Sequence, residues 1–123
     1  MIKSPGVLWG LIVPVVCIVI ISAGQLLFKL ASAHFDFRRP FADAKGLWIL
    51  VVALVLYGFA TLLWVAALRN APLSRLYPIT ALAFVLVPLG SLLILKEPLS
   101  LQYWLGSGLI IAGMAVIGRS FAS

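Results

Sequence analysis

The polar side chains that could do chemistry in this sequence lie inside or beside long apolar runs. Ser22, Gln25 and Lys29 follow the spacing i, i+3, i+7, which places them on one face of a helix. A polar stripe on an apolar helix normally faces protein or a water-filled cavity, because exposing it to hydrocarbon is costly. The ammonium of Lys29 could therefore bind an anion at the mouth of a pathway. Alternatively, Lys29 reaches the lipid headgroups along its own stem as a boundary lysine.

A second polar face lies on another apolar run, where Tyr77, Thr80, Phe84 and Ser91 share one side of the helix. Arg75 lies near the start of this run. The guanidinium of Arg75 can bind a phosphate through two hydrogen bonds, which a lysine cannot do. Its alternative role is that of an anchor at the membrane edge. Pro78 and Pro88 each remove a backbone donor from this run and predict a bent helix, which suits the wall of a cavity.

Glu97 follows Lys96 directly after the same run. Its carboxylate could close an ion pair with Lys29, which we expect at the same face of the membrane. It could also simply lie in water beside Lys96, because exposed ion pairs are weak.

Motifs for catalysis are absent from the sequence. There is no Cys/His cluster for zinc, no glycine-rich phosphate loop with its lysine and no Ser/His/Asp set. The single histidine, His34, falls in a polar connection, where a solvated residue is expected rather than a catalyst. We therefore predict that the protein is not an enzyme and holds no metal and no cofactor.

The amino-acid composition indicates the kind of structure that positions these residues. The chain has 123 residues, of which 64% are hydrophobic and 10% are charged. Soluble domains are about 45–50% apolar and about 25% charged. This chain therefore lacks the polar residues to cover a soluble globule. The net charge of +6 would suggest nucleic acid in a soluble protein, but here the basic residues flank apolar runs and predict contact with anionic lipid headgroups.

Four segments are long and apolar enough to cross the ~30 Å hydrocarbon core of a bilayer, which takes about 20 helical residues. The sequence thus predicts an all-α membrane protein with four transmembrane helices in a single domain, residues 1–123. The predicted helices are residues 7–33, 47–68, 73–95 and 99–118. The connection before residue 47 is predicted to be a polar loop or short interfacial segment. The other two connections are predicted to be tight, each ending in a proline, Pro72 or Pro98, that can open the next helix.

Four crossings place both termini on one side of the membrane. The first side carries Lys3, Arg69, Arg75 and Arg119, and the second carries Lys29, Arg38, Arg39, Lys45 and Lys96. Orientation follows the bias in Lys and Arg between the two sides, and this bias is almost nil. Two interpretations stay open: the chain inserts either way or takes its orientation from a partner, or the rule is too noisy for a protein of this size.

Small residues recur in the last segment, where Gly106, Gly108, Ala112 and Gly113 lie close together. Small residues let helices approach closely in lipid. They predict either an oligomer interface or packing within one subunit.

Two stretches carry a resemblance to a known group of proteins. One is Ser22-Ala23-Gly24-Gln25-Leu26-Leu27-Phe28-Lys29, and the other runs from Ala71-Pro72-Leu73-Ser74-Arg75 through Lys96-Glu97-Pro98-Leu99-Ser100 to Ile110-Ile111-Ala112-Gly113. They resemble the four-helix branch of the drug/metabolite transporter superfamily. The chain is similar to the small multidrug resistance proteins and to EamA-type repeats, and closer to the subunits that flip aminoarabinose-phosphoundecaprenol. The resemblance implies a small multidrug resistance-like bundle in the bacterial inner membrane.

One departure separates the branches of that superfamily. The drug exporters use a glutamate inside the first helix, three residues before the glycine matched by Gly24, and here that position is Ile21. The charges that remain in the spans are positive and favour an anionic ligand such as a lipid phosphate.

The resemblance therefore implies a flippase subunit for a polyprenyl phosphate, namely undecaprenyl phosphate carrying a sugar. In this hypothesis Lys29, oriented by Glu97, holds the phosphate at one leaflet, and Arg75 with Arg69 holds it at the other. The headgroup path is lined by Ser22, Gln25, Tyr77 and Thr80.

The resemblance also implies a dimer, either of identical subunits or with a related four-helix subunit, and no nucleic acid. Two alternatives stay open. One is a small-solute or drug exporter of the EamA or small multidrug resistance type. The other is an accessory subunit of a membrane glycosyltransferase that itself moves no lipid.

Overall fold

The computed structural model describes residues 5–39, 41–69 and 71–122, and this part of the chain is helical without strands. The elements are α1 (Pro5–His34), α2 (Ala44–Leu68), α3 (Leu73–Leu76), the 3₁₀ helix η1 (Tyr77–Leu82), α4 (Ala83–Leu93) and α5 (Leu101–Ala122). They form four apolar spans of 21–25 residues, namely Gly10–His34, Ala44–Leu68, Leu73–Leu93 and Leu101–Phe121. The predicted all-α class with four transmembrane helices is confirmed.

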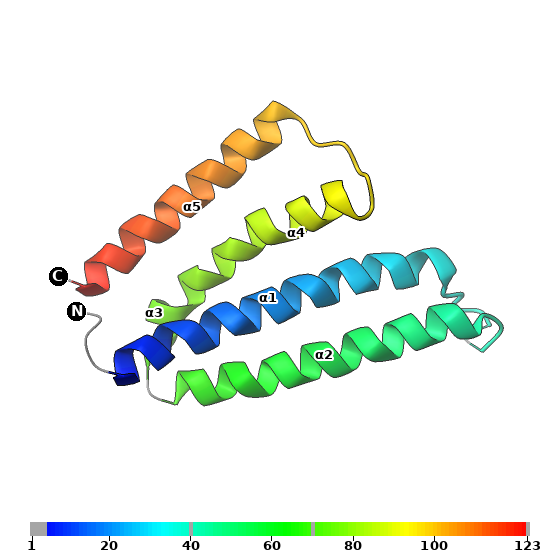
Figure 1. The fold of residues 1–123 in the computed structure, drawn as a ribbon, viewed down its shortest axis with the longest axis horizontal. Helices are drawn as coiled ribbons and strands as arrows, with labels where there is room; N and C mark the ends of the chain where they lie inside the picture. The colour runs from blue at the N-terminus through cyan, green and yellow to red at the C-terminus, as the bar shows by residue number, and fades with distance from the viewer. Residues whose placement is uncertain (1–4, 40, 70, 123) are drawn as a thin grey trace.

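The four spans run lengthwise past one another (Figure 1). The α1–α2 and α4–α5 connections lie at one end of the molecule, and the α2–α3 connection and the C-terminal end of α5 lie at the other. Within the described residues, this arrangement agrees with the two sides assigned to the basic residues from the sequence. Lys3, which was assigned to the side of the termini, lies outside the described residues.

The third span is not one continuous α-helix. It comprises α3, η1 and α4, and Pro78 lies at the start of the 3₁₀ segment. Proline lacks the amide hydrogen that an α-helix uses, so the backbone around Pro78 departs from α-helical hydrogen bonding. Pro78 thus interrupts the α-helical hydrogen bonding of this span over a six-residue 3₁₀ segment, and the bend expected from the sequence stays a prediction. Pro88 is buried inside α4, which remains α-helical around it.

The connection between α4 and α5 differs from the tight turn that the sequence predicted. α4 ends at Leu93 and α5 begins at Leu101, so Pro98 does not open the last helix. Lys96 adopts a left-handed backbone conformation with φ 57°. This residue reverses the chain direction, and the following residues run without helical structure to α5.

α1 and α2 form a close antiparallel pair, because small residues occupy the contact. Gly24 approaches α2 so closely that a Cβ there would lie 3.5 Å from the ring of Tyr57. Ala53 and Ala60 of α2 are fully buried. The rings of Phe28 and Tyr57 meet at a centroid distance of 5.8 Å. Small side chains that allow backbones to approach are the usual way to pack helices in lipid.

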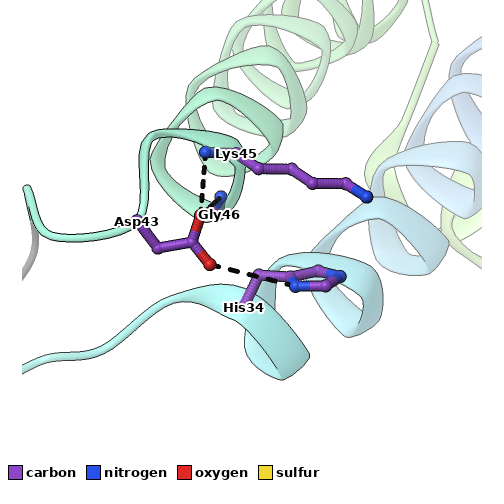
Figure 2. A network of polar contacts seen from close by, with 4 residues as sticks. All are labelled: His34, Asp43, Lys45 and Gly46. Atoms are coloured by element: carbon purple, nitrogen blue, oxygen red, sulfur yellow. Dashed lines mark hydrogen bonds and ion pairs between the residues drawn. The ribbon is translucent and has the colours of Figure 1, made fainter.

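Asp43 joins the end of α1 to the start of α2 (Figure 2). Its Oδ1 accepts hydrogen bonds from the backbone amides of Lys45 and Gly46, at 3.0 and 3.5 Å. Its Oδ2 lies 3.9 Å from Nδ1 of His34, the last residue of α1. The carboxylate thus satisfies free amides at the N-terminus of α2, where a negative charge is also favourable.

We expect Asp43→Ala to lower the free energy of unfolding by about 1 kcal/mol, because the first turn of α2 loses its cap. Asp43→Asn is the matched control, since an asparagine oxygen can accept the same amide hydrogen bonds. Equilibrium unfolding of the detergent-solubilised protein measures both variants. If Asp43→Ala and Asp43→Asn lower the free energy of unfolding equally, the amide hydrogen bonds that Asp43 accepts contribute little to stability.

Candidate functional site

The polar stripe of α1 borders the face of α1 that packs on the third span. Ile18, Ser22 and Leu26 form one row at a spacing of four residues, and Ile18 and Ser22 are buried. Leu26 continues the row and contacts Gly90 of α4. Gln25 and Lys29 flank this row at the helical spacings of three and seven residues from Ser22. The predicted stripe therefore lies beside the contact between α1 and α4.

Ser22 is the buried member of this stripe. Only 3% of the residue is exposed, and its Oγ has no hydrogen-bond partner in the part of the chain that the structure describes. A buried hydroxyl without a partner costs about 1–3 kcal/mol. Such a group can hydrogen-bond a polar ligand that reaches this part of α1.

Lys29 lies five residues before the end of α1 and is exposed. Its backbone carbonyl accepts a 2.6 Å hydrogen bond from the hydroxyl of Ser32, but its ammonium has no ion-pair partner among the described residues. Gln25 is exposed one turn earlier. An unpaired ammonium within the last turns of a membrane span can bind an anion without first breaking another ion pair.

Glu97 does not form the ion pair with Lys29 that the sequence suggested. Its Oε1 instead accepts a 2.7 Å hydrogen bond from the hydroxyl of Ser91, and its amide donates to the Ser91 carbonyl at 3.1 Å. These two bonds attach the α4–α5 connection to the last turn of α4. Because Ser91 follows Gly90, which contacts Leu26, the carboxylate lies at the same end of the molecule as Lys29.

The contact of Gly90 with Leu26 fixes how closely α4 approaches the polar stripe. A Cβ at position 90 would overlap the end of the Leu26 side chain. That side chain can rotate away from a methyl group but has less room to avoid a branched one.

We expect Gly90→Val to lower the free energy of unfolding by about 1–3 kcal/mol through overpacking against α1. Gly58→Val is the matched control, because nothing lies within 4 Å of a Cβ at that helical position. The same unfolding measurement compares the two. Destabilisation that is no larger at position 90 than at position 58 would contradict the contact.

The other predicted polar residues lie at the opposite end of the spans. Arg69 follows the last residue of α2, and Arg75 lies in α3; both are exposed. Tyr77 is 62% exposed. The hydroxyl of Thr80 donates a 2.6 Å hydrogen bond to the carbonyl of Tyr77, so its proton is used locally. The structure thus separates the two sets of cations along the membrane normal.

The small residues of α5 that the sequence singled out leave open space around them, although Ser107 between two of them is buried. A Cβ at Gly106, Gly108 or Gly113 would meet nothing within 4 Å, and Ala112 is exposed. α5 is the least buried span, at 6%. Packing within one subunit therefore does not explain these glycines, and an oligomer interface stays a prediction.

Sequence reasoning placed Ser91 on the polar face of the third span but missed Gly90, the residue that lets α4 approach α1. The available signal was a glycine beside Ser91 inside an apolar span, since small residues permit helices to approach closely.

Comparison with known proteins covers nearly the whole chain. The model of the EamA-like transporter family matches residues 6–119. No solved structure matches this chain.

Three curated relatives carry the same name, probable 4-amino-4-deoxy-L-arabinose-phosphoundecaprenol flippase subunit ArnE. The one from Klebsiella pneumoniae (strain 342) is 38% identical and covers 85% of this chain and 96% of its own length. The one from Aeromonas salmonicida (strain A449) is 36% identical, with 88% and 95% covered. The one from Escherichia coli O45:K1 (strain S88 / ExPEC) is 40% identical, with 80% and 86% covered.

These matches agree with the fold, because four spans that match bacterial transporter subunits over most of their length describe a multi-pass protein of the bacterial inner membrane. The superfamily resemblance found in the sequence is confirmed. The chain belongs to the EamA-like transporter family, close to the ArnE flippase subunits.

Proposed function

We propose that this protein is a flippase subunit that translocates an anionic polyprenyl-phosphate lipid, namely undecaprenyl phosphate carrying a sugar, across the inner membrane. The observation that carries the proposal is the similarity to curated flippase subunits over 85% of this chain and 96% of the relative. Because related folds carry many cargoes, the chemistry of the site must also fit a lipid phosphate.

The charges of the chain support an anionic cargo. All three acidic residues, Asp36, Asp43 and Glu97, lie outside the spans. The ammonium of Lys29 is unpaired within the last turns of α1. A phosphate monoester or diester at this depth would gain a charge-assisted hydrogen bond, whereas a cationic drug would meet only repulsion.

Two phosphate positions at opposite ends of the spans suit a lipid that changes leaflet. In this proposal Lys29 binds the phosphate at one leaflet, near the Ser91–Glu97 hydrogen bond. Arg75 and Arg69 bind it at the other leaflet, where a planar guanidinium can donate two hydrogen bonds to one phosphate. The isoprenoid tail remains in the hydrocarbon throughout.

The headgroup then passes along polar groups between these positions. Ser22 offers a buried hydroxyl without a partner, and Gln25 offers an amide one turn from Lys29. Tyr77 and Thr80 contribute from η1, where 3₁₀ geometry replaces regular α-helical hydrogen bonding. The transport requires no covalent step, so we propose no enzymatic activity and no cofactor.

Only 6% of the α5 span is buried within the chain, so most of this helix is not covered by protein of the same chain. A single subunit therefore cannot enclose the pathway. We propose that a second four-helix subunit, either an identical copy or a related chain, completes it. The open small residues of α5 are the proposed contacts, with Gly108 and Ala112 on one face of the helix and Gly106 and Gly113 on the other.

Mass spectrometry of lipid retained after purification in mild detergent tests the cargo. The proposal predicts a polyprenyl-phosphate species, with its sugar, in stoichiometric amount, and less of it in Lys29→Ala. Retention of bulk phospholipid alone, by the wild type as well as by this variant, would favour a solute exporter or a non-transporting accessory subunit.

A further inference from the structure

The connection between α1 and α2 exposes apolar side chains that no membrane span explains. Phe37 is 87% exposed and Phe41 is 82% exposed, more than any other large apolar side chain in the described part of the chain. The exposed apolar residues within the spans face lipid, but Phe37 and Phe41 lie between His34, where the first span ends, and Ala44, where the second begins. Arg38 and Arg39 lie between these two phenylalanines. We call Phe37, Arg38, Arg39 and Phe41 the basic-aromatic turn.

The backbone around these residues is held in a defined turn. The amide of Arg38 donates to Oδ1 of Asp36 at 2.9 Å, and the amide of Arg39 donates to the Asp36 carbonyl at 3.2 Å. The amide of Ala42 donates to the Arg39 carbonyl at 3.0 Å. The rings of Phe35 and Phe37 meet edge to face at 4.9 Å.

The same contacts leave the arginine side chains free. Asp36 accepts from a backbone amide, and Asp43 caps α2 and faces His34. Within the described residues neither Arg38 nor Arg39 forms an ion pair, although both carboxylates lie only a few positions away in the sequence. The guanidinium groups are therefore available to an external anion.

The fold places the turn at the depth of the lipid headgroups, because it directly joins two spans at one end of the molecule (Figure 1). At that depth aromatic side chains enter the boundary of the acyl chains, while arginines meet the phosphates above it. We propose that the basic-aromatic turn is a binding site for the anionic phospholipid headgroups of that leaflet. Phe37 and Phe41 insert beside the acyl chains, and Arg38 and Arg39 bind the lipid phosphates.

Charge complementarity favours this occupant over a protein partner. The turn carries two guanidinium groups, each able to bind one phosphate through two hydrogen bonds, against the single carboxylate of neighbouring Asp36. The surface of a leaflet that contains anionic lipid offers phosphates at high density, and the phenylalanines fit its apolar layer. The site is separate from the polar stripe of α1, so the proposal does not depend on the transported cargo.

Native mass spectrometry of protein released from vesicles of equal phosphatidylglycerol and phosphatidylcholine tests the selectivity. We expect the retained lipid to be enriched in phosphatidylglycerol, with the enrichment falling up to about fivefold in each of Arg38→Ala and Arg39→Ala. Arg119→Ala is the matched control, because Arg119 is an exposed arginine at the opposite end of the spans. Enrichment that is unchanged in the Arg38 and Arg39 variants, or lost equally in Arg119→Ala, would overturn the proposal.

A spin label at Ala42 tests the depth while leaving the turn residues intact, with Cys17→Ala removing the single native cysteine. In vesicles that contain phosphatidylglycerol we expect the label to be more accessible to oxygen than to a water-soluble nickel complex. Phe37→Ser with Phe41→Ser should shift it toward the nickel complex. A label that is water-exposed in every vesicle would overturn the proposal and indicate that the turn projects from the membrane, where a protein partner would bind it.

Discussion

Lys29→Ala is expected to reduce translocation of the polyprenyl-phosphate lipid by about 10- to 100-fold while leaving the fold intact. Hydrogen bonds to charged groups contribute about 1.5–3 kcal/mol, and removing the ammonium also leaves the lipid phosphate without a counter-charge near the membrane interior. The fold should survive, because the ammonium has no ion-pair partner in the described part of the chain. Translocation of a fluorescent polyprenyl-phosphate analogue, normalised to the amount of folded protein, measures the effect.

Two further variants separate charge from position. Lys45→Ala removes an exposed lysine from the same end of the molecule, in the first turn of α2, and should leave translocation unchanged. Lys29→Arg keeps the positive charge and should retain more activity than Lys29→Ala. Full activity in Lys29→Ala, or equal loss in Lys45→Ala, would remove Lys29 from the proposed site.

Gly46→Ala is expected to lower the free energy of unfolding by about 3 kcal/mol. A Cβ at this position would lie 2.6 Å from the His34 carbonyl carbon and 2.7 Å from the Phe35 amide nitrogen. These are backbone atoms, so the clash can be relieved only by separating α1 from α2. Overpacking against atoms that cannot rotate away falls at the upper end of the usual 1–3 kcal/mol.

Gly58→Ala is the matched control for Gly46→Ala in the same helix. Nothing lies within 4 Å of a Cβ at Gly58, and alanine is the better helix former there. Equilibrium unfolding in detergent should therefore show a stability that is unchanged or slightly raised for Gly58→Ala. Similar stabilities for the two variants would mean that the helices do not meet as closely as the structure places them.

The number and the helical type of the spans were predictable from the sequence, because the hydropathy of a segment depends only on its own residues. The interruption of helical hydrogen bonding at Pro78 was also predictable, since proline removes a backbone donor wherever it occurs. The sequence did not predict that hydrogen bonding around it becomes 3₁₀ over six residues, because that depends on how η1 packs against the neighbouring helices.

The candidate site was predictable in its residue types but not in its contacts. Spacing placed Ser22, Gln25 and Lys29 on one face, yet only the packing of α1 against its neighbouring helices decides that Ser22 is buried and Lys29 exposed. The ion pair of Glu97 with Lys29, one of two possibilities that the sequence left open, does not form. Ser91 lies six residues away from Glu97 in the same chain segment, so a short connection brings these two residues together before any other helix is involved.

Lipid translocation in native inner-membrane vesicles, where any second subunit is present, tests the proposed function most directly. Vesicles from cells that lack this chain should lose translocation of undecaprenyl phosphate carrying its sugar. The wild-type chain should restore it, and Lys29→Ala should not. Equal translocation rates in vesicles with and without the chain would contradict the proposal that this protein moves a polyprenyl-phosphate lipid.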